Sequence, residues 1–522
     1  MKINHKELAI FLLIIFLSIF FRFYNFRSLF QFSFDEEVWS YRIQRIITFK
    51  DYRLIGSEIS STGLFTAPLF IYFHVPLYIL GNLDPLVSGY FWGGVGVITT
   101  LLIYFFTKKY FSKFAAQIAS ILYASSFMMA LHDRRFWNVS PIPIVSVLSA
   151  WLLHLALENK KYALIMLSLV LTFGFNSHSS TVPIFLGVVV SWLVHKRKKV
   201  ISPLQKREMV IAVSLFLLLN FVPQVLFDFR HDFWHVKALR NTFISFSQPK
   251  KTESNADLLG VTTKFTHSMG SLIYLGENID VANEMSHCQP LIDARPKPPT
   301  WAIIIGIFLI TWLVAYSIIN RHKPLSTFLL VLVTINLLGL FIYRERVFTY
   351  HFAPIMPFIF VFAGVLLGKL QHKIPQIVPF LLLVAFVFIN SKSLLSASSE
   401  VSYLTKKTVV NEIIQQTKDK NISVDFLPSC EIYGFRYLFT SQKKPVAKSW
   451  EDQALGWLFK EELSQDFDMH VTVAVPDAGN SPDYNHLLFQ SQKESDHFTS
   501  IGKIKIFFSS LLPNTGSNTT VY

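Results

Sequence analysis

Long apolar runs recur along this chain and constrain its fold more than any other feature. A first run, 8–24, follows Lys2 and Lys6. Ten more runs lie at about 86–106, 113–131, 140–157, 161–176, 180–195, 208–227, 300–319, 324–343, 350–368 and 374–391. A hydrocarbon core about 30 Å thick is crossed by roughly 20 helical residues, and lipid leaves backbone groups no partners outside the helix. The sequence therefore predicts an α-helical polytopic membrane protein with about eleven transmembrane helices.

The composition excludes several other classes of protein. Hydrophobic residues make up 52% of the chain, aromatic residues 15% and charged residues only 16%, which rules out disordered and fibrous proteins. The net charge of +14 is ordinary in a membrane protein, because Lys and Arg fix its topology, so we expect no nucleic-acid partner. Cys288 and Cys430 lack the spacing of a zinc site or of a disulfide framework.

Charge predicts which loops face the cytoplasm. Lys and Arg gather in alternate short loops, at 108–113, 160–161, 196–207, 321–323 and 369–373. By the positive-inside rule these loops are cytoplasmic, as is the amino terminus, with 8–24 as an uncleaved anchor. The apolar stretch Ala67–Leu80 is then a re-entrant or interfacial helix, and 25–66, 228–299 and 393–522 lie outside. The cytoplasmic membrane of a prokaryote is the expected location.

The tail differs in composition from the rest and predicts a second domain. Residues 1–392 form the membrane domain, and 393–522 form a small extracytoplasmic α/β domain. Helical spacing over 404–418 and 431–438 alternates with strand-like runs at 422–427, 471–475 and 501–508. Since the tail has no phosphate loop or metal-ligand cluster, we expect it to assist folding or acceptor recognition.

Ionisable residues gather at the outer mouths of the spans rather than within them. Asp35, Glu36 and Glu37 follow the first span. Acidic residues there either complement the dipole of the next helix or act in catalysis, and the two roles are compatible. Arg134 and Arg135 with Trp137 and Asn138 are either an aromatic-belt anchor or a phosphate site, since guanidinium matches phosphate oxygens bidentately. The remaining outer candidates are His178, Asp228, Arg230, His231, Arg344, Arg346, Tyr350 and His351.

Five of these motifs occur in an order that resembles a known family. They are Asp35-Glu36, the Arg134, Trp137 and Asn138 element, Gly174 with His178, the Asp228, Arg230 and His231 element, and Tyr350-His351 with Pro354. In this order the chain resembles the polytopic GT-C glycosyltransferases of the protein O-mannosyltransferase and lipid A aminoarabinose transferase type, the family 39-like branch. The resemblance implies transfer of a sugar from a polyprenyl-phosphate donor to an extracytoplasmic acceptor, with Asp35 as the base.

The sequence departs from the family in two places. Many relatives carry an Arg near the start of the second full span, whereas 86–102 contains none, and the usual Trp-Asn-Pro is here Trp137-Asn138-Val139. The phosphate contact then falls to Arg134 or to an Arg of a later loop. A divalent metal near Asp35 and Glu36 is possible but not required by the chemistry.

The chemistry needs a base for the acceptor hydroxyl and a cation for the leaving phosphate, which predicts an inverting single displacement. The acceptor is a protein, a lipid or a glycan, and the partners are membrane lipid and the lipid-linked donor. The alternative is a transporter or flippase for a lipid-linked or anionic solute, whose Arg-rich mouth binds phosphate without catalysis.

Overall fold

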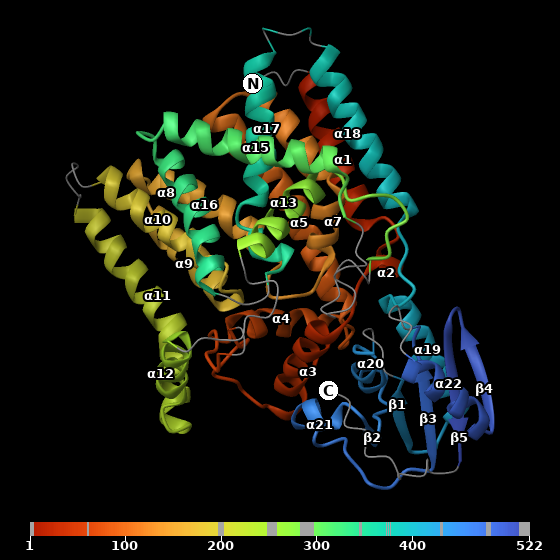
Figure 1. Ribbon diagram of the computed structural model, residues 1–522. Coiled ribbons are helices and arrows are strands. Elements are labelled where there is room, and N and C mark those ends of the chain that lie inside the picture. Colours follow the sequence, from red (N-terminus) through yellow and green to blue (C-terminus); the bar gives the residue numbers. More distant parts are fainter. Residues whose placement is uncertain are drawn as a thin grey trace.

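The chain forms a bundle of apolar helices with a small sheet-containing part at one end (Figure 1). The computed structural model describes residues 5–59, 62–196, 203–247, 258–281, 297–343, 347–371, 373, 375, 377–427, 432–476 and 482–510. The helical bundle and the small C-terminal sheet confirm the predicted fold class.

Each predicted apolar run contains helix. The corresponding helices are α1 (His5–Phe23), α5 (Leu86–Tyr110), α6 (Lys113–Ser125), α7 (Phe127–Arg134), α8 (Ile142–Leu157), α9 (Ala163–Ser177), α10 (Thr181–Lys196), α11 (Pro203–Arg230), α15 (Thr300–Ile319), α16 (Pro324–Tyr343), α17 (Met356–Leu370) and α18 (Ile377–Ser396). In the described part of the chain, five of them are long and apolar enough to cross a membrane, or six if α6 and α7 form one bent span. The protein is thus a multi-pass membrane protein, while the count of eleven spans and the side that each loop faces stay predictions.

The run 113–131 is not one straight helix, because α6 and α7 meet at a 62° bend. Ser126 between them has an extended backbone (φ −68°, ψ 116°). The backbone N–H of Phe127 donates to Oδ1 of Asn390 at 3.0 Å, and Oγ of Ser126 donates to the carbonyl of Leu272 at 3.0 Å. Side chains and backbone from distant segments therefore provide the hydrogen bonds that a straight helix would make within itself.

The segment predicted as the outer loop 228–299 contains two helices, α12 (Trp234–Ser247) and α13 (Leu258–Ile273). Helix α12 continues from α11 beyond the bundle (Figure 1). Helix α13 is packed inside the bundle, where Val261, Met269 and Leu272 are fully buried. Helix α13 lies outside the apolar runs predicted from the sequence, and it is only 16 residues long.

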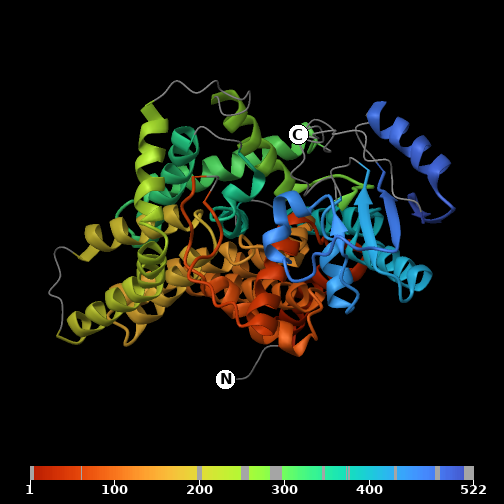
Figure 2. The same ribbon diagram turned by 90° about the horizontal axis from the view of Figure 1, so that it is seen from below.

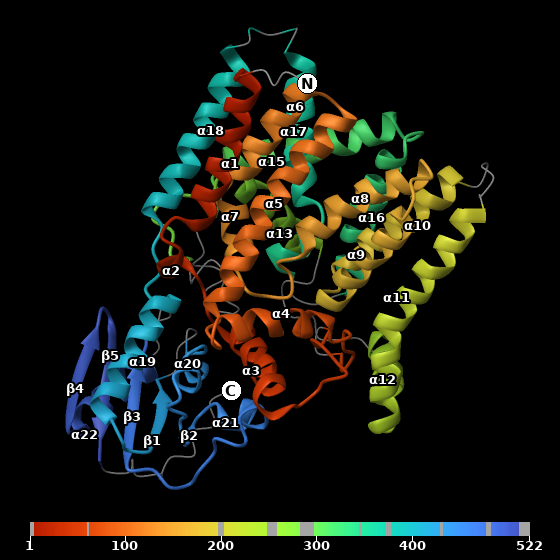
Figure 3. The same ribbon diagram turned by 180° about the vertical axis from the view of Figure 1, so that it is seen from behind.

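Two helices lie beneath the bundle in the segment between α1 and α5. Helix α3 (Phe34–Phe49) follows the short α2 (Phe26–Leu29), and α4 (Leu69–Leu80) crosses under the ends of the bundle helices (Figures 1 and 3). Nε1 of Trp92 on α5 donates to Nε2 of His74 on α4 at 2.9 Å. A helix at Ala67–Leu80 is thus confirmed, while its depth in a membrane stays a prediction.

The C-terminal part is a five-stranded mixed sheet of order β2-β1-β3-β5-β4. Its elements are α19 (Tyr403–Thr417), β1 (Ile422–Phe426), α20 (Arg436–Ser441), β2 (Lys448–Ser449), α21 (Asp452–Leu455), the 3-10 helix η3 (Gly456–Leu458), β3 (Met469–Ala474), α22 (Pro482–Glu494), β4 (His497–Ile501) and β5 (Ile504–Ser509). Strand β1 pairs parallel to β2 and β3, and β5 pairs antiparallel to β3 and β4.

Two of the predicted tail elements have different bounds in the structure. The run 501–508 is the end of a hairpin, because β4 ends at Ile501 and β5 starts at Ile504. Gly502 between them has φ +58°, a turn conformation that glycine adopts without steric cost. The second tail helix begins at Arg436 rather than at Glu431, which lies outside the described residues.

Helix α3 occupies the space between the bundle and the sheet. Seen from below, α3 and the segment that follows it lie between the C-terminal sheet on one side and α12 on the other (Figure 2). Arg45 on α3 binds both carboxylate oxygens of Glu461 at 2.6 and 3.0 Å, and Trp234 on α12 donates to the carbonyl of Gly63 at 2.8 Å. Helix α3 and the segment after it are therefore held against two other parts of the chain, the C-terminal sheet region and α12.

Candidate functional site

Three consecutive carboxylates open α3, and each has a different environment. Glu36 is fully buried. Its Oε2 accepts from the backbone N–H of Ser33 at 3.2 Å and from Oγ of Ser33 at 2.8 Å, while Oε1 accepts from Nε of Arg135 at 2.8 Å. Glu36 thus caps the helix and pairs with the buried Arg135. These contacts explain why a glutamate stands at the start of α3.

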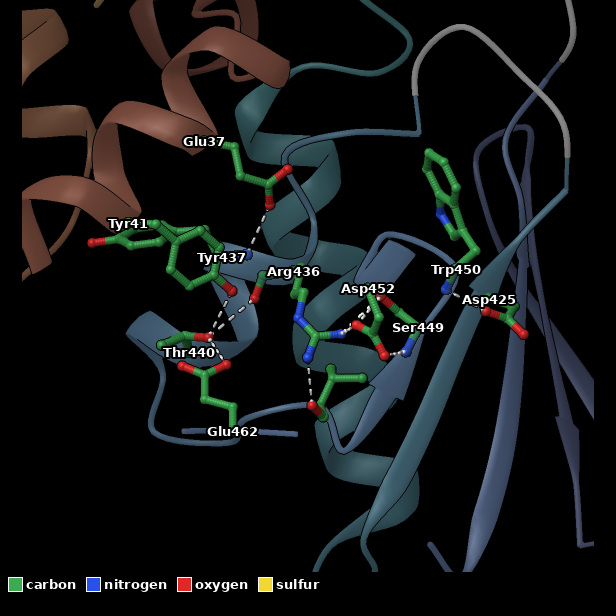
Figure 4. Close-up of polar contacts among 11 residues, drawn as sticks. Glu37, Tyr41, Asp425, Arg436, Tyr437, Thr440, Ser449, Trp450, Asp452 and Glu462 are labelled. Carbon is green, nitrogen blue, oxygen red and sulfur yellow. Dashed lines mark hydrogen bonds and ion pairs between the residues drawn. The ribbon is translucent and has the colours of Figure 1, made fainter. Parts of the chain in front are cut away.

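Glu37 is also fully buried, but it faces the C-terminal sheet domain (Figure 4). It accepts from the backbone N–H groups of Gly434 at 2.7 Å and Tyr437 at 2.9 Å. Gly434 has φ +90°, and an added Cβ would lie 2.2 Å from the carbonyl oxygen of Phe32. Burial raises the pKa of Glu37, and the two N–H groups partly oppose this. Glu37 therefore fastens the sheet domain to α3.

Asp35 is the one carboxylate of these three that retains partial exposure to solvent. Its negative charge acts on His178 and on Arg42. In each case it raises the pKa of the neighbouring group. A base has to reach a proton on its substrate, which the buried Glu36 and Glu37 cannot do. Of the three acidic residues, Asp35 is the one whose side chain is accessible for such a contact.

Four further predicted residues come together beside Asp35 from three segments of the chain. Tyr350 is central: its ring centroid lies 5.0 Å from that of Trp137, 5.6 Å from that of His178 and 4.5 Å from that of His351. The two histidine rings are 6.1 Å apart. We call Trp137, His178, Tyr350 and His351 the aromatic cluster.

Both histidines of the aromatic cluster favour the neutral form. Burial lowers the pKa of His178 to about 4, against a weaker opposite effect of Asp35. Nδ1 of His351 accepts from the backbone N–H of Phe348 at 3.0 Å. At neutral pH these side chains are therefore suited to hydrogen bonding and packing rather than to holding an anion by charge.

The two adjacent arginines point to different places. The guanidinium of Arg135 lies 4.0 Å from the ring centroid of Trp137, between the aromatic cluster and Glu36. Arg134 is 1% exposed and donates through Nη2 to the carbonyls of Phe21 at 2.6 Å and Tyr24 at 2.9 Å. Arg134 therefore holds the end of α1, and its predicted role in phosphate binding stays a prediction.

The Asp228, Arg230 and His231 element does not join the aromatic cluster. It lies at the corner between α11 and α12, where Asp228 accepts from Nδ1 of His235 at 2.7 Å and where Arg230 and His231 are exposed. This corner packs on the segment after α3, with the ring of His235 5.9 Å from that of Phe65. The separation has a physical cause, because α11 packs along α9 at the edge of the bundle (Figure 1), where Oγ of Ser168 donates to the carbonyl of Ala212 at 2.6 Å, and Arg230 and His231 lie at its exposed end.

The other predicted residues are placed as follows. Nδ2 of Asn138 donates to Oγ of Ser57 at 3.2 Å, which links the start of α8 to the segment after α3. Arg344 and Arg346 lie outside the described residues.

Sequence reasoning missed three residues on the far side of Asp35: Arg42, Arg53 and Trp457. Arg42 lies seven residues after Asp35 and so shares its face of α3, a spacing that was visible in the sequence. Its guanidinium lies 5.9 Å from the ring centroid of Trp457, and that of Arg53 lies 5.1 Å from it. No local signal could have placed Trp457, because it comes from the sheet domain more than 400 residues away.

The side chains of the described residues do not fit a divalent metal. Throughout the described ranges, no group of three or more His, Cys, Asp or Glu side chains is placed to hold one. Both carboxylate oxygens of Glu36 already accept hydrogen bonds from Ser33 and Arg135. We therefore derive no catalytic step through a metal.

Comparison with protein families gives one match. Residues 94–227 match the family described as dolichyl-phosphate-mannose-protein mannosyltransferase. The match covers α6 to α10 and most of α5 and α11, and it includes Arg134, Trp137 and His178. A search of curated proteins finds no match.

Several solved structures resemble the chain at low sequence identity. The Archaeoglobus fulgidus oligosaccharyltransferase tethered with an acceptor peptide is 11% identical, with a TM-score of 0.50 over 90% of this chain and 69% of that one. Mycobacterial arabinofuranosyltransferase AftD is also 11% identical, with a TM-score of 0.50 over 98% of this chain and 40% of that one. ArnT from Cupriavidus metallidurans bound to undecaprenyl phosphate is 12% identical, with a TM-score of 0.46 over 96% and 97%.

These comparisons agree with the order of motifs in the sequence and with the arrangement of the helices. The family match and the fold indicate an enzyme of the glycosyltransferase type. The predicted resemblance is confirmed, and the chain has the fold of the polytopic GT-C glycosyltransferases.

Proposed function

We propose that the protein transfers a sugar from a polyprenyl-phosphate donor to a hydroxyl of an extracytoplasmic acceptor. One observation carries the proposal: Asp35 alone among three adjacent carboxylates keeps partial exposure, and it lies beside the aromatic cluster. The matched family is described by a dolichyl-phosphate donor, and ArnT was solved with undecaprenyl phosphate. Both descriptions support a lipid-phosphate donor here.

Asp35 acts as the general base of the reaction. It takes the proton of the acceptor hydroxyl, the acceptor oxygen forms a bond to the anomeric carbon, and the bond from that carbon to the phosphate oxygen breaks. The bonding electrons leave with the polyprenyl phosphate. Because Glu36 and Glu37 are buried and bonded elsewhere, no second carboxylate of this turn is free to act as a nucleophile. A single displacement with inversion follows.

Arg135 supplies the cationic side of the reaction. Arg135 stands against Trp137 at the edge of the aromatic cluster, where its charge is shared with Glu36. A phosphate placed there meets a guanidinium and the neutral His178, both of which can donate hydrogen bonds to its oxygens. Arg344 and Arg346 precede Tyr350 in the sequence and keep their predicted role as further phosphate contacts.

The transporter alternative is less well supported. A transport path usually holds ionisable groups near the bilayer midplane. The buried charges at the carboxyl end of α1 are instead paired, with Nη2 of Arg22 2.7 Å from Oδ2 of Asp133. The site proposed here lies under the bundle, between α3 and the bundle ends, which suits chemistry at a membrane surface.

The test is a sugar-release assay on the purified full-length protein in detergent. The protein is mixed with a polyprenyl-phosphate sugar that carries a label on its sugar. A fraction of cell-envelope material serves as the source of the acceptor. We expect the label to move to the acceptor fraction, with release of polyprenyl phosphate. In liposomes, movement of the intact labelled donor across the bilayer without cleavage would instead support the flippase and overturn the proposal.

A further inference from the structure

We propose that Arg42, Arg53 and Trp457 form a binding site for an anionic group of the acceptor, a phosphate or a carboxylate, beside the base. The proposal rests on the proposed function, because it assigns the substrate class of the same site. The acceptor is then a hydroxyl compound that carries a negative charge, rather than a neutral one.

The three side chains meet where α3 touches the sheet domain. Arg42 comes from α3, Arg53 from the segment after it, and Trp457 from η3. The guanidinium of Arg42 lies between two indoles, 5.1 Å from the ring centroid of Trp39 and 5.9 Å from that of Trp457. Trp457 is 49% exposed, so this meeting point opens to solvent.

Both arginines have unused hydrogen-bond donors. Nη1 of Arg42 donates to the carbonyl of Gly56 at 3.1 Å, and Nη2 of Arg53 lies 3.5 Å from Oδ2 of Asp51. Within the described residues, the buried Nε of Arg42 and that of Arg53 have no hydrogen-bond partner. Guanidinium groups desolvated in this way gain from an anion that accepts in a bidentate manner.

In the part of the chain that the structure describes, Arg42 has no carboxylate partner at short range, and Arg53 shares its only close one. No carboxylate of the described chain lies within 4.0 Å of Arg42, although Asp35 and Glu58 act on it from farther away. Burial, followed by repulsion from Arg53, lowers the pKa of Arg42 to about 10. Burial also lowers the pKa of Arg53, whose neighbour Asp51 is shared with Arg45.

Arg45, one turn farther along α3, provides the contrast. It binds both oxygens of Glu461, Oδ2 of Asp51 at 2.7 Å and the carbonyl of Leu458. The sheet domain thus supplies Arg45 with a carboxylate, whereas it supplies Arg42 and Arg53 only with the ring of Trp457. Arg45 holds the domain in place, and the other two arginines are left to bind a ligand.

The position of Arg42 and Arg53 along the chain indicates that they contact the acceptor rather than the donor. Arg42 follows Asp35 by two helical turns, about 10 Å along the axis, toward the end of α3 that points away from the bundle (Figure 1). The lipid part of a donor has to stay with the bundle, so this end of α3 faces the water-soluble side of the reaction. A sugar or similar ring beside the anionic group can pack on the exposed indole of Trp457.

Binding is measured on the full-length protein in detergent by isothermal titration calorimetry, with inorganic phosphate in one arm and glucuronate in the other. We expect one of the two anions to bind, and Arg42→Gln and Arg53→Gln each to weaken it about tenfold or more. Arg42→Lys keeps the charge but loses the planar fork, so it should weaken binding less. Arg240→Gln, an exposed arginine on α12, is the matched control and should bind as the wild type does.

The melting temperature of each variant shows whether it has folded, and Arg53→Gln gives a second test if Arg42→Gln does not fold. Tighter binding of phosphate identifies a phosphorylated acceptor, and tighter binding of glucuronate an acidic sugar. Absence of binding to both anions, or equal binding by the wild type and the folded arginine variants, overturns the proposal. Because the sugar-release assay is separate, a protein that cleaves the donor but binds neither anion refutes only this inference.

Discussion

Two regions of this protein carry similar residues and differ in what the fold makes of them. The first turn of α3 contains Phe34-Asp35-Glu36-Glu37, and the corner between α11 and α12 contains Phe227-Asp228-Phe229-Arg230-His231. The turn is enclosed by the bundle and the sheet domain, whereas Arg230 and His231 at the corner are exposed. Enclosure gives each carboxylate of the turn a separate environment, while the corner has one short hydrogen bond between Asp228 and His235.

Replacement of the two aspartates tests this difference most strongly. Asp35→Asn should lower the turnover of a polyprenyl-phosphate sugar by about two to four orders of magnitude, because a general base is lost. Asp228→Asn should change turnover by no more than about twofold, as expected for a residue outside the cluster. The measurement is kcat for release of polyprenyl phosphate. Equal losses in the two variants would remove the distinction between the regions.

Replacement of the two arginines compares their effects on stability. Arg135→Met leaves the fully buried Glu36 without its charge partner, which should cost about 3–5 kcal/mol of unfolding free energy. Arg230→Met removes an exposed charge and should change the unfolding free energy by about 0.5 kcal/mol or less. Denaturant unfolding in detergent gives both values. The double variant Glu36→Gln with Arg135→Met should recover part of the loss, and no recovery would contradict the ion-pair explanation.

A smaller effect is expected from pH, through Glu451 at the contact between α3 and the sheet domain. Both carboxylate oxygens of Glu451 are buried, with no hydrogen-bond partner in the described chain. Burial and the nearby Glu37 raise the pKa of Glu451 well above its ordinary value of 4.5. The folded state therefore holds this proton more tightly than the unfolded state, so stability should fall as the pH rises above about 4.5.

The measurement is the melting temperature between about pH 5 and pH 8 for the wild type and for Glu451→Gln. The wild type should melt at a higher temperature toward the acidic end, and the variant should show a weaker dependence because its amide does not titrate. The same slope in both proteins would show that Glu451 does not contribute.

Much of the site could be predicted from the order of motifs. Trp137, His178, Tyr350 and His351 come from three segments, and the structure brings the other three rings within about 6 Å of that of Tyr350. The sequence also predicts that the acidic turn can both cap a helix and present a carboxylate to a substrate. In the structure Glu36 forms a capping box, while Asp35 stays accessible. The placement of Asp228, Arg230 and His231 apart from this cluster could not be foreseen, because the motif does not show that α11 lies at the edge of the bundle.

The sequence by itself determined the helices, since an apolar run in lipid has to satisfy its hydrogen bonds locally. The sequence also determined where α3 begins, because Ser33 and Glu36 cap that helix through contacts between residues only three positions apart. Tertiary structure alone decided which carboxylate stays accessible, since this depends on Arg135 and Gly434 from distant segments. It also placed Trp457 against Arg42 and broke the run 113–131 at Ser126. The environment of a side chain is set by contacts between distant segments, and local periodicity carries no information about those contacts.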